Sequence, residues 1–178
     1  MSANELDPML ISIFRNELAF QSEQVLIAVE DLNRCLEGSQ NDTRFWYSLT
    51  GALNAMANIG NILWPQQNRK GSKRRAELLR QHLGLGPDSV LALHEVRNGF
   101  AHFDERIDEW HATSERRNFA DRNIAGRTGI VGLDEGDFAR NYDPEGRTIS
   151  VFGKRLDFQG AVNDVTSLRG ILVQSPTT

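Results

Sequence analysis

Residues 7–37 read DPMLISIFRNELAFQSEQVLIAVEDLNRCLE, and this stretch decides the fold class. Its apolar residues mostly recur three and four positions apart, the spacing that places side chains on one face of an α-helix. Asp7 can cap the first turn, and Pro8 suits the first helical position. We therefore expect a helix from Pro8 to about Glu37, a length typical of a helix that lies along a bundle or a dimer interface.

The same spacing continues beyond the first helix. The second predicted helix can be capped by Asp42 or Thr43 and is stopped by Trp64-Pro65, because the residue before a proline avoids the helical conformation. Further helices are predicted over residues 72–83, from Pro87 through the apolar positions up to Phe100, and over residues 157–173. The chain is thus predominantly helical by its pattern.

The helical spacing of apolar residues is lost in the second half of the chain. Residues 111–137 hold few apolar side chains and several glycines, so we interpret them as an irregular insertion. Residues 138–142 and 148–152 flank Asp143-Pro144-Glu145-Gly146, whose Pro and Gly suit a type I turn, and they predict a small β-hairpin. The expectation is one domain over residues 1–178, an all-α bundle of four or five helices with a small β-hairpin and an irregular insertion before the last helix.

The composition is that of an ordinary globular chain. The 178 residues are 39% hydrophobic and 25% charged, with a net charge of -4 and a single cysteine. Residues 1–8 lack the basic flank and apolar core of a secretory signal, and no apolar run reaches membrane-spanning length, so we expect a cytoplasmic protein without membrane contact. Arg and Lys cluster at 69–70, 73–75 and 80, which permits a local phosphate-facing patch, although a solvated helix face is the commoner explanation for any single arginine.

A candidate chemistry is found in residues 93–106, LHEVRNGFAHFDER. Arg97 can hold a phosphate through two parallel hydrogen bonds, and His102, five positions later, belongs to the residue type that exchanges protons near neutral pH. Asn98 is a compact polar residue that could reach the same phosphate or orient His102. Gly99 removes a side chain beside the site, which allows another backbone to approach closely. Together these residues suggest an RNA-cleaving site that needs neither a metal nor a cofactor.

The bare spacing of this motif is common. Seventeen Arg and four His predict about one match of an Arg followed five to seven positions later by a His, and the chain holds three. The competing pairs are Arg106 with His111 and Arg75 with His82, neither of which has a polar residue directly after the arginine. Arg97 and His102 are preferred because Asn98, Gly99 and a strongly apolar helix surround them.

Helix geometry sets a condition on this site. Five positions along a straight helix rotate a side chain by about 500°, a net of about 140°, so Arg97 and His102 would not share a face. Either the helix is distorted near Gly99, or the active surface straddles a groove, or a second subunit completes the site. We favour the last two together.

The segment Arg97-Asn98-Gly99-Phe100-Ala101-His102 resembles the Arg-x4-6-His signature of the HEPN superfamily, including the polar residue that this family commonly has after its arginine. The predicted bundle is also similar to that family's four-helix core. The resemblance implies a metal-independent endoribonuclease, often within toxin–antitoxin or other bacterial defence and stress systems, and a homodimer whose two motifs face one cleft. It further implies that Arg97, Asn98 and His102 carry the reaction on RNA, and that an antitoxin or regulatory protein is a possible partner. The tyrosine that some members carry two positions after the histidine is replaced by Asp104.

Other interpretations stay open. His102 and Arg97 could form a structural ion-pair network with Glu95, Asp104 or Glu105, and the chain would then be a non-catalytic helical module that binds a partner protein or a nucleotide. A metal site built from His94, His102, Asp104 and Glu105 is conceivable, but such clustered carboxylates are mostly solvated. The start of a zinc-protease motif at His94-Glu95 fails because Asn98 stands where the second histidine is needed.

Overall fold

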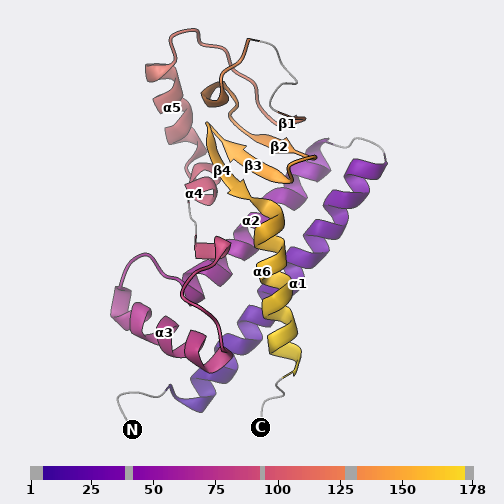
Figure 1. The fold of residues 1–178 in the computed structure, drawn as a ribbon. Helices are drawn as coiled ribbons and strands as arrows, with labels where there is room; N and C mark the ends of the chain where they lie inside the picture. Colours follow the sequence, from indigo (N-terminus) through magenta and orange to yellow (C-terminus); the bar gives the residue numbers. More distant parts are fainter. Residues whose placement is uncertain (1–5, 39–41, 93–94, 127–131, 175–178) are drawn as a thin grey trace. The chain divides into compact units, whose positions relative to one another are not determined.

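The computed structural model describes residues 6–38, 42–92, 95–126 and 132–174. These residues form six α-helices, three short 3₁₀ turns and a four-stranded mixed sheet (Figure 1). The fold is therefore mainly helical with a sheet, and the prediction of an all-α bundle is wrong. The prediction failed because two of the four strands, at two and four residues, are too short to show an alternating pattern between polar neighbours.

The chain divides into two compact units. One consists of residues 1–92 and 161–178, and the other consists of residues 93–160. None of the helices in the described part of the chain is long and apolar enough to cross a bilayer.

The first unit is built on an antiparallel pair of helices, α1 (Pro8–Glu37) and α2 (Asp42–Leu63), whose predicted bounds are confirmed (Figure 1). The Asp7 carboxylate accepts the backbone N–H groups of Met9 and Leu10 at 2.8 and 3.2 Å, so it caps α1 as predicted. The core between the helices is fully buried and holds large apolar side chains, among them Leu18, Val25, Phe45, Leu49 and Ile59.

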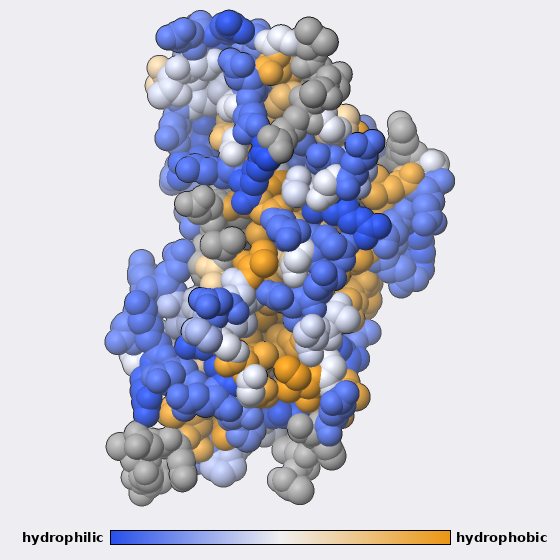
Figure 2. Space-filling model, in the orientation of Figure 1, coloured by the Kyte–Doolittle hydropathy of each residue, from blue (hydrophilic) through white to orange (hydrophobic). Residues whose placement is uncertain are grey.

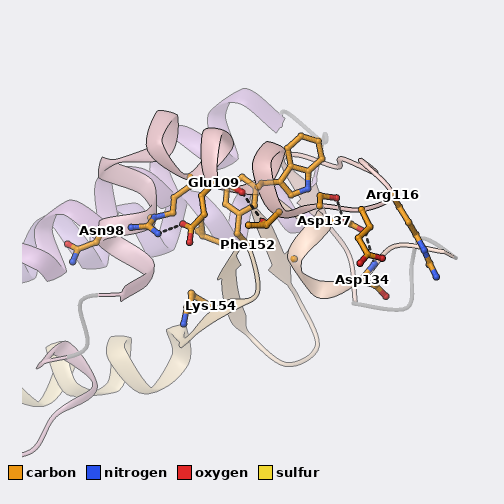
Figure 3. Close-up of a pocket in the computed structure, with 15 residues that line it drawn as sticks. Asn98, Glu109, Arg116, Asp134, Asp137, Phe152 and Lys154 are labelled. Atoms are coloured by element: carbon orange, nitrogen blue, oxygen red, sulfur yellow. Dashed lines mark hydrogen bonds and ion pairs between the residues drawn. The ribbon is translucent and has the colours of Figure 1, made fainter.

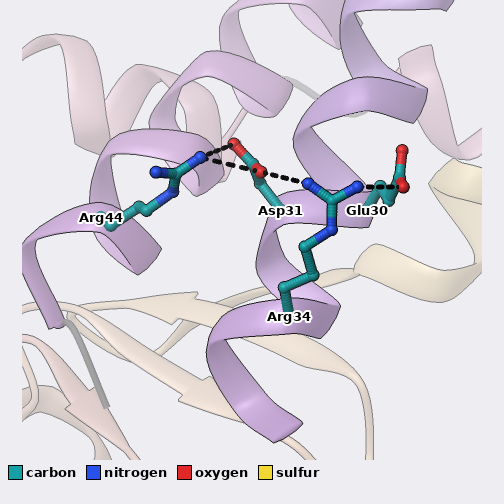
Figure 4. A network of polar contacts seen from close by, with 4 residues as sticks. All are labelled: Glu30, Asp31, Arg34 and Arg44. Carbon is teal, nitrogen blue, oxygen red and sulfur yellow. Dashed lines mark hydrogen bonds and ion pairs between the residues drawn. The ribbon is translucent and has the colours of Figure 1, made fainter. Parts of the chain in front are cut away.

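Exposed ion pairs join α1 and α2 near the turn between them. Arg44 of α2 lies 3.1 Å from both carboxylate oxygens of Asp31, and Arg34 bridges Asp31 and Glu30 (Figure 4). Both arginine side chains are more than half exposed, so water and salt screen the network. It contributes little to stability, and the buried apolar seam holds the helices together.

Helix α3 (Ser72–Leu83) follows a short 3₁₀ turn at Arg69–Gly71 and ends, as predicted, at Gly84, whose φ of 67° is left-handed. Two of its arginines bind the end of α2: Arg75 donates to the Ile62 carbonyl at 3.1 Å, and Arg80 donates to the Leu63 carbonyl. These carbonyls have no partner within their own helix, so the arginines both satisfy them and fix α3 in place.

The helix predicted from Pro87 onward is not continuous. A 3₁₀ turn spans Val90–Ala92, and the Asp164 carboxylate of α6 (Phe158–Gln174) accepts the Val90 N–H at 3.0 Å and the Ser89 hydroxyl at 2.5 Å. Helix α4 begins only at Glu95 and ends at Ala101. The side chain of Asp164 competes for the backbone groups at the start of this segment, a tertiary contact that periodicity cannot reveal.

The second unit combines α4, α5 (Phe103–Thr113) and the sheet. The sheet order is β1-β2-β3-β4, with β1 and β2 parallel and the other neighbours antiparallel. The strands are β1 (Asn123–Ile124), β2 (Asn141–Asp143), β3 (Thr148–Val151) and β4 (Lys154–Asp157). The predicted hairpin is β2–β3, whereas β1 and the extension of α5 to Thr113 replace part of the expected irregular insertion, and β4 lies between the predicted hairpin and the last helix.

Candidate functional site

The predicted motif lies where one helix ends and the next begins. His102 separates α4 from α5 with φ −117° and ψ 47°, outside the helical region. Its N–H still donates to the Asn98 carbonyl at 2.9 Å, and its own carbonyl accepts the Arg106 N–H at 3.2 Å. The five positions from Arg97 to His102 therefore do not follow a straight helix. Of the three possibilities raised by the sequence, a distortion of the helix is present, three residues after Gly99.

Gly99 is required by the packing of α4 against the sheet. A Cβ atom built on Gly99 would lie 2.9 Å from Cγ1 of Val151, a buried residue of β3. That distance is shorter than real Cβ contacts allow, so a side chain here would push the helix off the strand. The sequence predicts that a backbone approaches Gly99 closely, whereas the group that does so is the side chain of Val151 in β3.

The two described motif side chains differ in exposure. The His102 side chain is 57% exposed, and its Nδ1 lies 3.6 Å from Oε1 of Glu105. Asn98 is half-buried. Arg97 lies within α4, but its side chain falls outside the described part of the structure. The exposed imidazole is accessible to a large substrate, and its pair with Glu105 is also one of the ion pairs that the non-catalytic alternative names.

A cavity of about 700 Å³ adjoins the motif within the second unit (Figure 3). We call it the α5 cavity, because α5 forms one wall through Arg106, Glu109 and Trp110. Asn98 and Gly99 line it as well, whereas His102 is not among its lining residues. Its size is in the range of small-molecule and nucleotide sites. His102 lies one helical turn from Asn98 and from Arg106, and the motif is therefore placed at the border of the cavity.

One aromatic wall of the cavity depends on a strained turn. Phe152 and Gly153 join β3 to β4 with φ angles of 45° and 80°, so both central residues of this two-residue hairpin are left-handed. Phenylalanine is unusual there, and the turn carries its ring to 5.9 Å from Phe103 and 6.4 Å from Phe119. Trp110 stacks edge-on against Phe119 at 4.9 Å. Phe152 and Trp110 line the cavity and give it an apolar side, while Phe103 and Phe119 support them from outside the lining.

The charged groups of the cavity are unevenly paired. Arg106 and Glu109 form an ion pair at 2.5 Å, and the buried Asp137 accepts the Asp134 N–H at 3.0 Å. By contrast, Arg116 and Lys154 have no carboxylate within ion-pair distance among the described residues, and both are exposed (Figure 3). Trp110 and Phe152 line the same cavity as these two cations, and this combination suits a ligand that carries both a phosphate and a flat ring.

The structure also bears on the two competing motif pairs. Arg106 is engaged with Glu109, and Arg75 donates to the Ile62 carbonyl while lying 4.5 Å above the Phe14 ring. Burial also lowers the pKa of Arg75 from its ordinary value. Both arginines thus have structural partners, which leaves Arg97 and His102 as the preferred pair.

Residues outside the motif were missed by the sequence analysis. Arg116, Lys154 and Phe152 enter the cavity from segments that had been interpreted as loop or hairpin end. The alternation of Ile149, Val151 and Leu156 about Gly153 was the available signal for a further strand. In the described part of the chain no group of three or more His, Cys, Asp or Glu side chains is placed to share a metal ion, and His94 lies outside it.

No family model, no curated protein and no solved structure matches this chain. The function of the protein is therefore inferred from the geometry of the motif and of the α5 cavity.

Proposed function

We propose that this protein is a metal-independent endoribonuclease in which His102, Arg97 and Asn98 act on RNA held at the α5 cavity. One observation carries the proposal: His102 is exposed at a break between two helices, one turn from Asn98 and Arg106, which line a cavity with aromatic and cationic walls. The resemblance of residues 97–102 to the HEPN motif supports the same activity.

The reaction needs one proton to be removed and one to be supplied. A ribose 2′-OH attacks the neighbouring phosphorus, so an O2′–P bond forms while the P–O5′ bond breaks. His102 accepts the 2′-OH proton as general base, and an imidazolium returns a proton to the leaving 5′ oxygen. Arg97 stabilises the extra charge on the pentacovalent phosphorus, and Asn98 orients the phosphate or the imidazole. The products are a 2′,3′-cyclic phosphate and a 5′-hydroxyl end.

Two histidines serve this chemistry better than one. We propose a homodimer in which His102 of one subunit acts as base and His102 of its mate acts as acid, as a two-fold axis would arrange them. Sedimentation should then give twice the chain mass of 20.0 kDa at assay concentrations. An active protein that sediments as a monomer would contradict the shared site. An antitoxin or regulatory protein that covers the exposed His102 belongs to the same proposal.

A second function is favoured by one feature of the cavity. His102 is not among its lining residues, so the α5 cavity could hold a nucleotide without cutting it. In that case Trp110 and Phe152 would contact the base, and Arg116 and Lys154 would contact the phosphate. Nucleotide binding without RNA cleavage would select this non-catalytic alternative.

The test is RNA cleavage in the presence of a chelator. Wild-type protein should cut, whereas His102→Ala and Arg97→Ala should each lose about 100-fold or more in rate. His111→Ala is the matched control, because His111 is exposed on α5 and completes the competing motif with Arg106. Equal rates in wild type and His102→Ala, or an equal loss in His111→Ala, would reject the assignment.

A further inference from the structure

The helix that follows His102 is acidic. Between Phe103 and Thr113, α5 holds four carboxylates and one arginine. Such a surface repels the phosphates of RNA, so the affinity for the RNA backbone must come from cations elsewhere.

Those cations are concentrated in one segment of the first unit. Residues 69–80 hold six Lys or Arg and one Glu, which gives this segment a net charge of +5. The whole chain has a net charge of −4, so the residues outside the segment carry −9. The segment comprises the 3₁₀ turn Arg69–Gly71 and most of α3. The surface of α3 that is visible in Figure 2 is mostly hydrophilic.

Three of the six cations have structural partners. Arg75 and Arg80 bind the carbonyls at the end of α2, and Arg74 pairs with Glu77 at 2.8 Å. The other three are Arg69, Lys70 and Lys73. All three are exposed, and none has a carboxylate within ion-pair distance in the part of the chain that the structure describes. Arg69 makes only a hydrogen bond to Gln67 at 2.8 Å.

We propose that Arg69, Lys70 and Lys73 form a binding surface for the phosphate backbone of RNA, an inference that builds on the proposed ribonuclease function. The three cations supply a sequence-independent electrostatic attraction that α5 cannot supply.

The apolar residues of α3 argue against the other polyanionic partners. Ala76, Leu79 and Leu83 are buried within the unit, and no large apolar side chain is exposed among residues 66–88. A helix that binds a membrane surface inserts an apolar face, which α3 lacks. Protein interfaces in turn depend on aromatic or aliphatic anchors at their centre, and the described surface of this segment offers none. RNA, whose charges all lie outside, fits a surface made of cations alone.

The test measures RNA binding rather than cleavage. The variant is Arg69→Gln with Lys70→Asn and Lys73→Gln, where asparagine is chosen because Lys70 has a left-handed φ of 49°. It is made in the His102→Ala background, and the probe is a mixed-sequence RNA of about 20 nucleotides. Loss of three phosphate contacts should flatten the slope of log affinity against log salt by about 2 and weaken binding about 100-fold near 0.1 M salt.

The matched control removes three arginines of the same unit that already have carboxylate partners. Arg34→Gln, Arg44→Gln and Arg169→Gln change the net charge equally, but their guanidinium groups pair with Glu30, Asp31 and Glu23. This control should bind within about threefold of the parent with an unchanged slope. An unchanged slope in the α3 variant would overturn the proposal, as would an equal loss in the control, or binding to phosphatidylserine vesicles in place of RNA.

The outcome separates this inference from the proposed function. RNA that is bound through α3 but never cut would reject the nuclease and leave the binding surface standing. RNA that is cut equally well, with unchanged KM, by the α3 variant carrying an intact His102 would reject the binding surface alone.

Discussion

At the scale of single residues, the candidate site depends on the break between α4 and α5 at His102. The backbone of His102 leaves the helical region, and a new helix starts with Asp104 and Glu105 in its first turn. Carboxylates are favourable at that end of a helix, because they complement the partial positive charge of its N-terminus. The same two residues keep the surroundings of His102 acidic, so the proposed function needs phosphate binding by cations in another part of the chain.

A second residue-scale consequence concerns Tyr142, which is 5% exposed in β2. Burial raises the pKa of its hydroxyl above the ordinary value. The positive charge of Arg147 lowers this pKa, and the negative charge of Asp143 raises it further. The folded state therefore favours the neutral phenol. The resulting stability is complete below the unfolded pKa of about 10 and is lost as the pH rises through the folded pKa. Urea unfolding can be measured from about pH 8 to about pH 11, a range that brackets the ordinary pKa of tyrosine. The wild type should lose stability over this range, and Tyr142→Phe should lose less.

Tyr47 provides the control, since it is the only other tyrosine and is 79% exposed. Tyr47→Phe should keep the alkaline profile of the wild type. A Tyr142→Phe protein that loses stability at high pH as steeply as the wild type would show that burial of this phenol has no such effect.

At the scale of elements, Gly99 joins α4 to β3. Alanine at this position would gain helix propensity, but its Cβ would meet Val151 at 2.9 Å. Overpacking costs about 1–3 kcal/mol and exceeds the propensity gain of about 1 kcal/mol or less. Gly99→Ala should therefore lower the free energy of unfolding, and Val151→Ala should recover part of the loss in a double-mutant cycle.

Gly51 serves as the comparison for this experiment. It is exposed in the interior of α2, and a Cβ built there has no neighbour within 4 Å. Gly51→Ala should raise the free energy of unfolding by about 0.5–1 kcal/mol, because only the propensity term remains. If both substitutions stabilise the protein, α4 does not pack as closely on β3 as the structure indicates.

The elements also show how far the sequence alone can predict the fold. The bounds of α1, α2 and α3 follow from apolar spacing and from caps such as Asp7 and Gly84, which act locally. The break at His102 and the strand β4 do not, and β4 follows a turn with Phe152 at a left-handed position, which apolar spacing does not reveal. Long amphipathic helices are predictable, whereas short elements fixed by distant partners are not.

The candidate site, too, was predictable from the sequence only in part. His102, Asn98 and Gly99 were found from residue types and spacing, and a close approach at Gly99 was expected, although from a backbone and not from the side chain of Val151. Its contact with Val151, and the contributions of Arg116 and Lys154 to the α5 cavity, required the structure, since these residues come together only when the second unit folds. Spacing in the sequence identifies the reactive groups, and tertiary contacts supply their surroundings.

At the scale of the whole molecule, charge and chemistry are divided between two units. Residues 69–80 of the first unit carry +5, while His102 belongs to the second unit and directly precedes the acidic helix α5. Under the proposed function, this division reconciles a net charge of −4 with a polyanionic substrate: Arg69, Lys70 and Lys73 would bind the backbone, and His102 would perform the proton transfer.

The most direct test of the central claim is the chemical nature of the RNA ends. Mass spectrometry of RNA treated with wild-type protein in excess chelator should show 2′,3′-cyclic phosphate and 5′-hydroxyl ends, which disappear with His102→Ala and persist with His111→Ala. Products that carry 3′-hydroxyl and 5′-phosphate ends, or cyclic phosphates formed as fast by His102→Ala, would contradict the account.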